Sequence, residues 1–229
     1  MVHPLEIHYS NARRIFWGIL SRRVAERGEV WIPDEYNRVI IPNLIRYALG
    51  DPAFNQAGPH FDLRKGITLF GAPGRGKSLL LASLNELLAV CSKIQKGKNS
   101  WRAGRQISTT AITDRLLKTL DKRTVHDYYQ GTWFFDDVGV EPVEVNAYGK
   151  VKPFVDIVNR MHDLWEKYDD NKRSTQQDAL LYMTTNLDPT DTLFDEHFDE
   201  RIGRRIRQMT NVIWLGGAPK GGALKSTAE

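Results

Sequence analysis

The sequence is poor in cysteine, in metal-ligand patterns and in long apolar runs. Its 229 residues include a single cysteine, Cys91, so no disulfide can form within the chain. The six histidines are scattered without the spacing of structural zinc sites, and we predict no structural metal. No apolar stretch approaches the length needed to cross a membrane. These absences favour a cytoplasmic protein with an apolar core, in which Cys91 is a small buried residue.

The overall composition is that of a globular chain. Hydrophobic residues make up 41% and charged residues 26%, and the length allows one α/β domain with a small appendage. The formal net charge of +4 is a mild bias toward a polyanionic partner. Many enzymes with no nucleic-acid role are equally basic, so the charge alone identifies no partner.

Residues 71–78, Gly-Ala-Pro-Gly-Arg-Gly-Lys-Ser, match the pattern G-x-x-x-x-G-K-[ST] at every fixed position. Apolar runs at 66–70 and 79–84 flank them and predict a strand, a loop and a helix. In that context backbone N–H groups form an anion site, Lys77 reaches the β- and γ-phosphates, and the Ser78 hydroxyl ligates Mg²⁺. We therefore predict that ATP and Mg²⁺ bind here; the alternative is a glycine-rich turn that merely caps a helix. The predicted binding residues are Gly71, Ala72, Pro73, Gly74, Arg75, Gly76, Lys77, Ser78 and Leu79.

Helices and buried strands alternate in the rest of the chain. Helices are expected over residues 7–25, 36–49, from the glycine-rich loop to about 92, and over 111–120 and 151–168. Strands are expected at 66–70, 107–110, 132–135 and 179–185. This order implies an α/β fold with a parallel central sheet covered on both faces. Because residues 50–62 look like a linker, we predict a helical N-terminal extension at 1–62 and an ATPase domain at 63–229.

Polar residues follow two of the predicted strands, at the edge where parallel sheets bind ligands. Asp136 can hold Mg²⁺ directly or through water, and Asp137 can orient or deprotonate an attacking water. Asn186 can position that water or the γ-phosphate through its amide. The alternatives are two solvated acids at a strand end and an Asx turn before Leu187.

A basic helix is expected over residues 199–207. Arg201 and Arg205 lie one turn apart on it and share a face. An arginine aimed at the γ-phosphate of a neighbouring subunit stabilises transition-state charge. A solvated basic face or a nucleic-acid patch fits the same spacing. The spacing alone therefore does not distinguish an arginine donated to a neighbouring subunit from these two alternatives.

These segments, in this order, resemble the AAA+ ATPases, and within them the DnaC/IstB group of helicase loaders and transposition ATPases. The resemblance covers residues 65–215. It is carried by the loop 71–78, Phe135-Asp136-Asp137-Val138-Gly139 with Glu141-Pro142, Asn146-Ala147-Tyr148-Gly149, Thr184-Thr185-Asn186-Leu187, and Glu200-Arg201 with Arg205-Ile206 and Met209-Thr210-Asn211.

The resemblance implies a P-loop NTPase of AAA+ type, a three-layer sandwich with no or minimal C-terminal lid. Asp136 and Asp137 look like the Walker B pair, and Asn186 looks like the sensor I residue. Arg205 looks like the arginine finger that one subunit donates to the next, with Arg201 as second choice or as a phosphate contact within the subunit. The usual Walker B pair ends in Glu, so Asp137 implies a slow or assembly-dependent ATPase.

By the same resemblance, the chain assembles into a ring or spiral whose central surface contacts DNA. The basic residues predicted to make that contact are Lys118, Lys122, Arg123, Lys150 and Lys152. A second basic loop, 93–105 around Trp101, is another candidate. Charged loops are often only solvated, which is the alternative for every one of these clusters.

The leading hypothesis is an oligomerising ATPase that acts on DNA, preferably single-stranded, as a DnaC-like loader of a replicative helicase. The second is an IstB-like transposition ATPase that selects a target on duplex DNA and works with a transposase. The third is an ATP-dependent switch or scaffold that binds no DNA. The N-terminal extension is the natural place for a partner adaptor, where Phe16, Trp17 and Trp31 either pack on the core or present an aromatic anchor.

Overall fold

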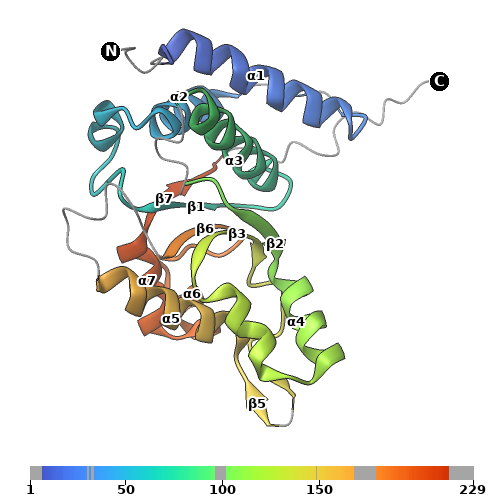
Figure 1. Ribbon diagram of the computed structural model, residues 1–229. Helices are drawn as coiled ribbons and strands as arrows, with labels where there is room; N and C mark the ends of the chain where they lie inside the picture. The colour runs from blue at the N-terminus through green and yellow to red at the C-terminus, as the bar shows by residue number, and fades with distance from the viewer. Residues whose placement is uncertain are drawn as a thin grey trace.

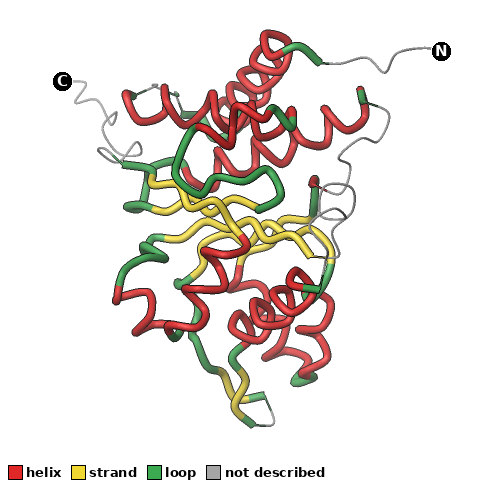
Figure 2. Tube along the Cα trace, turned by 90° about the vertical axis from the view of Figure 1, so that its left-hand side faces the viewer, coloured by secondary structure: helices red, strands yellow, loops and turns green. Residues whose placement is uncertain are grey.

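The computed structural model describes residues 7–29, 31, 34–95, 102–147, 149–167 and 179–216. They form three layers, with a five-stranded sheet between two layers of helices (Figure 1, Figure 2). The strands of the sheet are β1 (Gly66–Phe70), β2 (Arg105–Ser108), β3 (Gly131–Val138), β6 (Ala179–Thr185) and β7 (Thr210–Trp214). All of them pair in parallel, in the order β2-β3-β6-β1-β7. The predicted α/β fold with a covered parallel sheet is confirmed.

Three helices cover one face of the sheet: α1 (Tyr9–Ala25), α2 (Glu35–Leu49) and α3 (Lys77–Ile94). Phe16 on α1 is fully buried, and Trp17 and Trp31 pack against the same apolar cluster. Cys91 on α3 is buried as predicted, and burial raises the pKa of its thiol to about 11. The first two helices therefore share one continuous core with α3 and the sheet.

Four helices cover the other face: α4 (Thr109–Thr119), α5 (Pro153–Glu166), α6 (Thr192–Phe198) and α7 (Glu200–Met209). Successive residues of a strand point to opposite faces, so the central strands must supply apolar side chains to both layers. Phe134 and Tyr182 lie in the core under α3, whereas Phe135 and Met183 lie in the core under α5. This is why β3 and β6 read as unbroken apolar runs in the sequence.

Two short 3₁₀ helices and a small hairpin complete the described part of the chain. The 3₁₀ helices are η1 (Pro52–Gln56) and η3 (Lys122–Tyr128), and the hairpin pairs β4 (Val145–Asn146) with β5 (Lys150–Val151). The hairpin projects from the lower layer beside α4 (Figure 1). None of the described helices is both long and apolar enough to span a membrane.

The structure corrects the start of two predicted helices. Residues 109 and 110, predicted as strand, are the first turn of α4, because the Ser108 side chain caps the helix by accepting a hydrogen bond from the backbone N–H of Ala111 at 3.2 Å. The helix predicted from residue 151 begins at Pro153, since Val151 pairs with Val145 in the hairpin. Its predicted end at Tyr168 lies outside the described residues. Strand 179–185 has the predicted bounds, whereas α6 and β7 were not predicted.

Gly66 at the start of β1 tolerates no side chain. A Cβ atom built there would lie 1.7 Å from the backbone oxygen of Leu181 on β6. We expect Gly66→Ala to force the two strands apart and to lower the free energy of unfolding by roughly 3 kcal/mol, measured by urea denaturation. Gly18→Ala is the matched control, because Gly18 lies in α1 with open space around it and alanine there should stabilise by about 0.5 kcal/mol. Equal urea midpoints for Gly66→Ala and the parent would contradict this close approach.

Candidate nucleotide-binding site

The loop between β1 and α3 has a backbone that favours glycine. Gly71, Gly74 and Gly76 have φ angles of 145°, 74° and 83°. A Cβ atom at Gly71 would lie 2.5 Å from the backbone oxygen of Leu215, and one at Gly76 would lie 2.9 Å from the ring of Trp31. Gly76 is also the N-cap of α3, so the loop ends at a helix N-terminus, the arrangement that binds phosphate groups.

Lys77 links this loop to the end of β6. Its Nζ atom donates to the backbone oxygens of Gly71 at 2.8 Å and Ala72 at 2.9 Å, and to Oδ1 of Asn186 at 2.8 Å. The side chain is only 5% exposed. Lys77 and Asn186, which the sequence placed 109 residues apart, are thus in direct contact.

Strand register brings these two residues together. Phe70 at the end of β1 pairs with Thr185 at the end of β6, so Gly71 and Asn186 leave adjacent strands at the same level. The carboxyl end of β3 lies next to that of β6, because β6 separates β3 from β1 in the sheet. The three predicted strand-end groups therefore meet at one edge of the sheet.

Asp136 and Asp137 lie where the pairing of β3 is interrupted. The register with β6 shifts between Phe135 and Val138, and Asp137 has a φ angle of 56°, which is uncommon for a residue other than glycine. Thr184 holds this bend: its Oγ1 donates to Oδ1 of Asp136 at 2.5 Å and accepts from the backbone N–H of Asp137 at 2.9 Å. Such locally strained backbone, held by hydrogen bonds, is concentrated at functional sites.

The charges of Lys77, Asp136 and Asp137 act on one another. Burial raises the pKa of the Asp137 carboxyl and the neighbouring Asp136 carboxylate raises it further, while Lys77 lowers it. Burial lowers the pKa of Lys77, and the two carboxylates oppose that shift. The three residues therefore form one electrostatic unit, with one cation facing two acids.

Thr109 and Glu141 stabilise the turn after Asp137, and sequence analysis gave neither of them a role. Glu141 is 4% exposed, and its Oε2 accepts from Oγ1 of Thr109 at 2.6 Å and from the backbone N–H of Gly139 at 3.0 Å. The sequence signal that could have identified Glu141 is an acidic residue two positions after Gly139, close behind the Asp-Asp pair. Thr184 was quoted only as part of the resemblance, although it contacts both aspartates.

The side chains of the glycine-rich loop point in different directions. Arg75 is 1% exposed and is directed into the protein, with its Nη2 atom 3.6 Å from the Asp34 carboxylate at the N-cap of α2. Leu79 is buried in the core, and Ser78 is partly exposed beside Lys77 in the first turn of α3. The exposed residues of the loop are Ala72, Pro73 and Gly74. Among the loop side chains, Lys77 and Ser78 are thus the ones with polar groups placed for a phosphate and its metal, while Arg75 is engaged with the N-terminal helices.

The two predicted arginines of α7 have different surroundings. Arg205 is 8% exposed, and its Nη1 donates to Oδ1 of Asn159 at 2.5 Å while its Nη2 lies 3.5 Å from Oδ1 of Asp163, both on α5. Arg201 is exposed, and its backbone N–H is held by the Asp199 side chain at 2.6 Å. The spacing of one turn did not reveal that Arg205 packs against α5 while Arg201 faces solvent.

The two predicted basic clusters adjoin each other on the surface. The charges of Lys122 and Lys152 both lower the pKa of Asp156, which burial raises. The five predicted side chains are all exposed: Lys118, Lys122, Arg123, Lys150 and Lys152. Two of them have acidic partners, since Lys150 pairs with Glu144 at 3.0 Å and Arg123 pairs with Asp121 at 2.9 Å.

In the described part of the other basic loop, one of the cations is buried. Arg102 is 5% exposed and donates to the backbone oxygens of Tyr47 at 2.8 Å and Leu63 at 2.6 Å. It therefore joins α2 to the segment before β1. Trp101 lies outside the described residues.

No protein-family model matches the chain, and no curated protein matches it significantly. Three solved structures resemble it in fold at low sequence identity. A crystal structure of DnaI has a TM-score of 0.51 and 20% identity, covering 91% of this chain and 93% of its own. The DnaC helicase loader has a TM-score of 0.51 and 13% identity, covering 88% and 98%. A candidate primosome component from Streptococcus pyogenes serotype M3 has a TM-score of 0.52 and 15% identity, covering 83% and 85%. With its five parallel strands between two layers of helices, the chain has a fold similar to those of DnaI and the DnaC helicase loader.

Proposed function

We propose that the chain is an ATP-dependent AAA+ ATPase that acts on DNA as a loader of a replicative helicase. The observation that carries the ATPase part is the hydrogen bond of 2.8 Å between Lys77 and Asn186, which unites the phosphate loop with the end of β6 beside Asp136. The loader part rests on similarity in fold to DnaI and to the DnaC helicase loader.

The residues present fit a triphosphate. Lys77 is a buried cation whose hydrogen-bond partners among the described residues are neutral oxygens of Gly71, Ala72 and Asn186, while Asp136 and Asp137 act on it electrostatically. A buried charge with neutral partners is stabilised by a bound anion. Lys77 and the backbone N–H groups of the loop would therefore hold the phosphates of the triphosphate.

Ser78 and Asp136 would hold Mg²⁺. Magnesium in phosphate sites is commonly bound by one or two protein oxygens together with phosphate oxygens and water, so this small donor set is sufficient. The hydroxyl of Thr184 donates to Asp136 at 2.5 Å and would orient that carboxylate toward the ion. Bound ATP with Mg²⁺ supplies the phosphoanhydride bond that is broken and the cation that offsets the charge on it.

Asp137 and Asn186 would position the attacking water. The pKa of Asp137 is raised by burial and by Asp136, which improves its match to a general base at neutral pH. Its side chain is one methylene shorter than the glutamate usual at this place in the resembling family, so we expect slow turnover that depends on assembly. Asn186 would share its amide between Lys77 and the water or γ-phosphate.

Full activity would require a second copy of the chain. An arginine from α7 of a neighbouring subunit would complete the charge around the phosphates, and Arg201 is the exposed candidate while Arg205 is bonded to α5. In the resulting ring or spiral, the surface made by the end of α4, η3, the β4–β5 hairpin and the start of α5 would contact DNA through Lys118, Lys122, Arg123, Lys150 and Lys152. Helices α1 and α2 are the proposed adaptor for the helicase.

Electron microscopy of the purified chain with ATP separates this function from its alternatives. We expect ring or spiral particles with ATP that retain single-stranded DNA in preference to duplex, and co-purification with a hexameric helicase. Filaments on duplex DNA together with stimulation of a transposase would instead identify an IstB-like transposition ATPase. Assembly with ATP and no DNA binding, even at low salt where electrostatic binding is strongest, would identify a switch or scaffold.

A further inference from the structure

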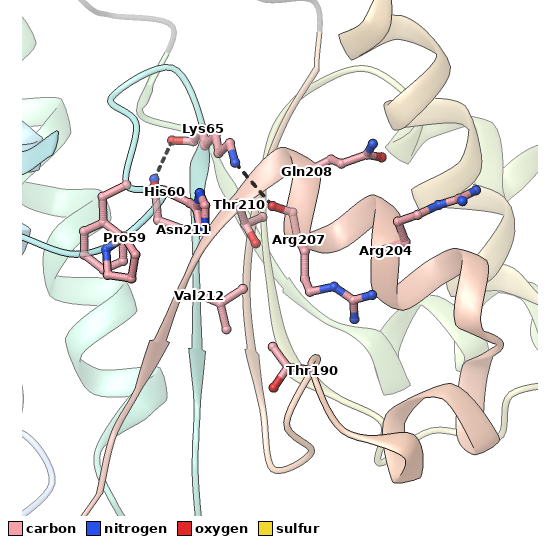
Figure 3. A pocket seen from close by; sticks show the side chains of 11 residues that line it. Pro59, His60, Lys65, Thr190, Arg204, Arg207, Gln208, Thr210, Asn211 and Val212 are labelled. Carbon is pink, nitrogen blue, oxygen red and sulfur yellow. Dashed lines mark hydrogen bonds between the residues drawn. The ribbon is translucent and has the colours of Figure 1, made fainter.

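A separate cavity lies at the opposite end of β1 from the phosphate loop. Its volume is about 470 Å³, it is open on one side, and it is bordered by α7, β7 and the segment 59–65 that leads into β1 (Figure 3). The four steps from Gly66 to Phe70 separate this end of β1 from the phosphate loop by about 13 Å. Its size falls within the range of small-molecule sites rather than that of single ions.

Hydrogen bonds of one buried side chain hold the floor of the cavity together. Asn211 on β7 is 1% exposed, accepts from the backbone N–H of Asp62 at 2.7 Å, and donates to the backbone oxygens of Asp62 at 2.9 Å and Gly66 at 2.8 Å. These bonds tie the segment before β1 to the edge strand of the sheet. The cavity is therefore built by long-range contacts and is more than a gap between loops.

The walls of the cavity carry positive charge. Lys65, Arg204 and Arg207 line it, and no acidic residue is among the described residues of its lining. Asp62 is the acid that acts on Lys65, but two hydrogen bonds of 2.9 and 2.7 Å commit its Oδ2 to Arg64. The local balance thus remains positive after Asp62 is counted.

The cations approach the cavity from two sides. Lys65 extends from the segment before β1, and its Nζ lies 3.4 Å from the backbone oxygen of Arg207. Burial lowers the pKa of Lys65, and Asp62 opposes that shift. The Arg207 guanidinium is fixed by donation to the backbone oxygen of Pro189, while Arg204 is exposed at the outer rim of α7.

We propose that this cavity is a second anion site, distinct from the phosphate loop, that takes a phosphate ester. Lys65 and Arg207 would contact the phosphate oxygens from opposite sides, and Arg204 would close the rim. A phosphate offers more acceptor oxygens than a carboxylate, which suits a site lined by three cations from two elements. Pro59, Phe61 and Val212 supply apolar wall for the attached sugar or base.

Two kinds of molecule carry such a phosphate ester, a single-stranded nucleic acid in its backbone and a free mononucleotide, and the test distinguishes them. The proposal does not depend on ATP hydrolysis at residues 71–78, so its test is made on the full chain carrying Lys77→Ala, which removes the main cation of the phosphate loop. The probes are a fluorescent thymidine oligonucleotide and thymidine monophosphate.

Two variants change the cavity itself. They are Lys65→Gln, whose amide can still donate to the backbone oxygen of Arg207, and Arg204→Gln. The matched control is Arg14→Gln on the exposed face of α1.

Oligonucleotide binding is followed by fluorescence anisotropy over a range of salt concentrations. Each site variant should reduce the slope of log affinity against log salt by about 0.7, the value for one lost phosphate contact on a single strand, and Arg14→Gln should leave it unchanged. Thymidine monophosphate is followed through the backbone amide resonances of Gln208 and Val212. Shifts of those resonances that Lys65→Gln abolishes, with no change in the oligonucleotide slope, support the site with a free mononucleotide as its ligand.

Two results would overturn the proposal. One is that Lys65→Gln and Arg204→Gln, both shown to be folded by circular dichroism, change neither the salt slope of oligonucleotide binding nor the resonance shifts caused by thymidine monophosphate. The other is that a glutamate-rich peptide shifts the Gln208 and Val212 resonances and the phosphate probes do not, which would make the cavity a docking surface for acidic protein segments.

Discussion

Lys77→Ala should lower the affinity of the chain for ATP about 100-fold and remove ATP turnover. The factor corresponds to the loss of roughly 3 kcal/mol, the upper range for a hydrogen bond to a charged group. The substitution removes a cation that lies between two backbone oxygens of the phosphate loop and the amide of Asn186, so it removes the phosphate contact and also the link between β1 and β6. Affinity is measured by calorimetric titration with ATP, and turnover by phosphate release.

A matched control separates this effect from loss of structure. Lys93→Ala changes an exposed lysine in the last turn of the same helix, so affinity and turnover should both match those of the parent. Circular dichroism must show that both variants retain their helices. If Lys77→Ala hydrolyses ATP at the parental rate, the assignment of residues 71–78 as a nucleotide site is wrong.

Sequence and structure agree most closely where a pattern is local and has one interpretation. The phosphate loop requires glycine at positions with positive φ, and β6 is an apolar run that must be buried on both faces, so both are evident from the residues alone. The convergence of Lys77, Asp137 and Asn186 also follows, because parallel strands bring their carboxyl ends to one edge. The bend at Asp137 and its support by Thr184 depend on strand register, which no local pattern contains.

Other features escaped prediction because tertiary contacts decide them. The hairpin β4–β5 is two residues long on each strand, too short to show a period. Thr109 was predicted to lie in a strand because it is β-branched. It lies instead in the first turn of α4, and its hydroxyl donates a hydrogen bond to Glu141, 32 residues away in the sequence. The burial of Arg205 depends on Asn159 and Asp163 on another helix, so spacing along α7 could not reveal it.

Arg201→Ala should remove assembly-dependent ATP hydrolysis while leaving the stability of the chain unchanged within about 0.5 kcal/mol. Arg201 is exposed, so in the proposed assembly its guanidinium would reach a neighbouring subunit, where such an arginine is worth about three orders of magnitude in rate. ATP binding by the monomer should remain normal. The measurements are phosphate release as a function of protein concentration, calorimetric titration with ATP, and urea denaturation.

Arg205→Ala is the comparison that decides between the two arginines. Arg205 would have to leave Asn159 and Asp163 to reach another subunit, so its removal should cost about 1–3 kcal/mol of stability through the partners it leaves unpaired. If folded Arg205→Ala loses assembly-dependent hydrolysis while Arg201→Ala keeps it, Arg205 is the residue donated between subunits and α7 must rearrange on assembly.

Mixing experiments test whether the site is shared at all. Arg201→Ala protein keeps Lys77, and Lys77→Ala protein keeps Arg201, so an interface between the two variants can combine one intact loop with one intact arginine. The mixture should therefore hydrolyse ATP faster than either variant alone. Because neither variant carries both groups, restored activity can arise only across a subunit boundary, and a mixture that stays inactive although both variants co-assemble would mean that each subunit completes its own site.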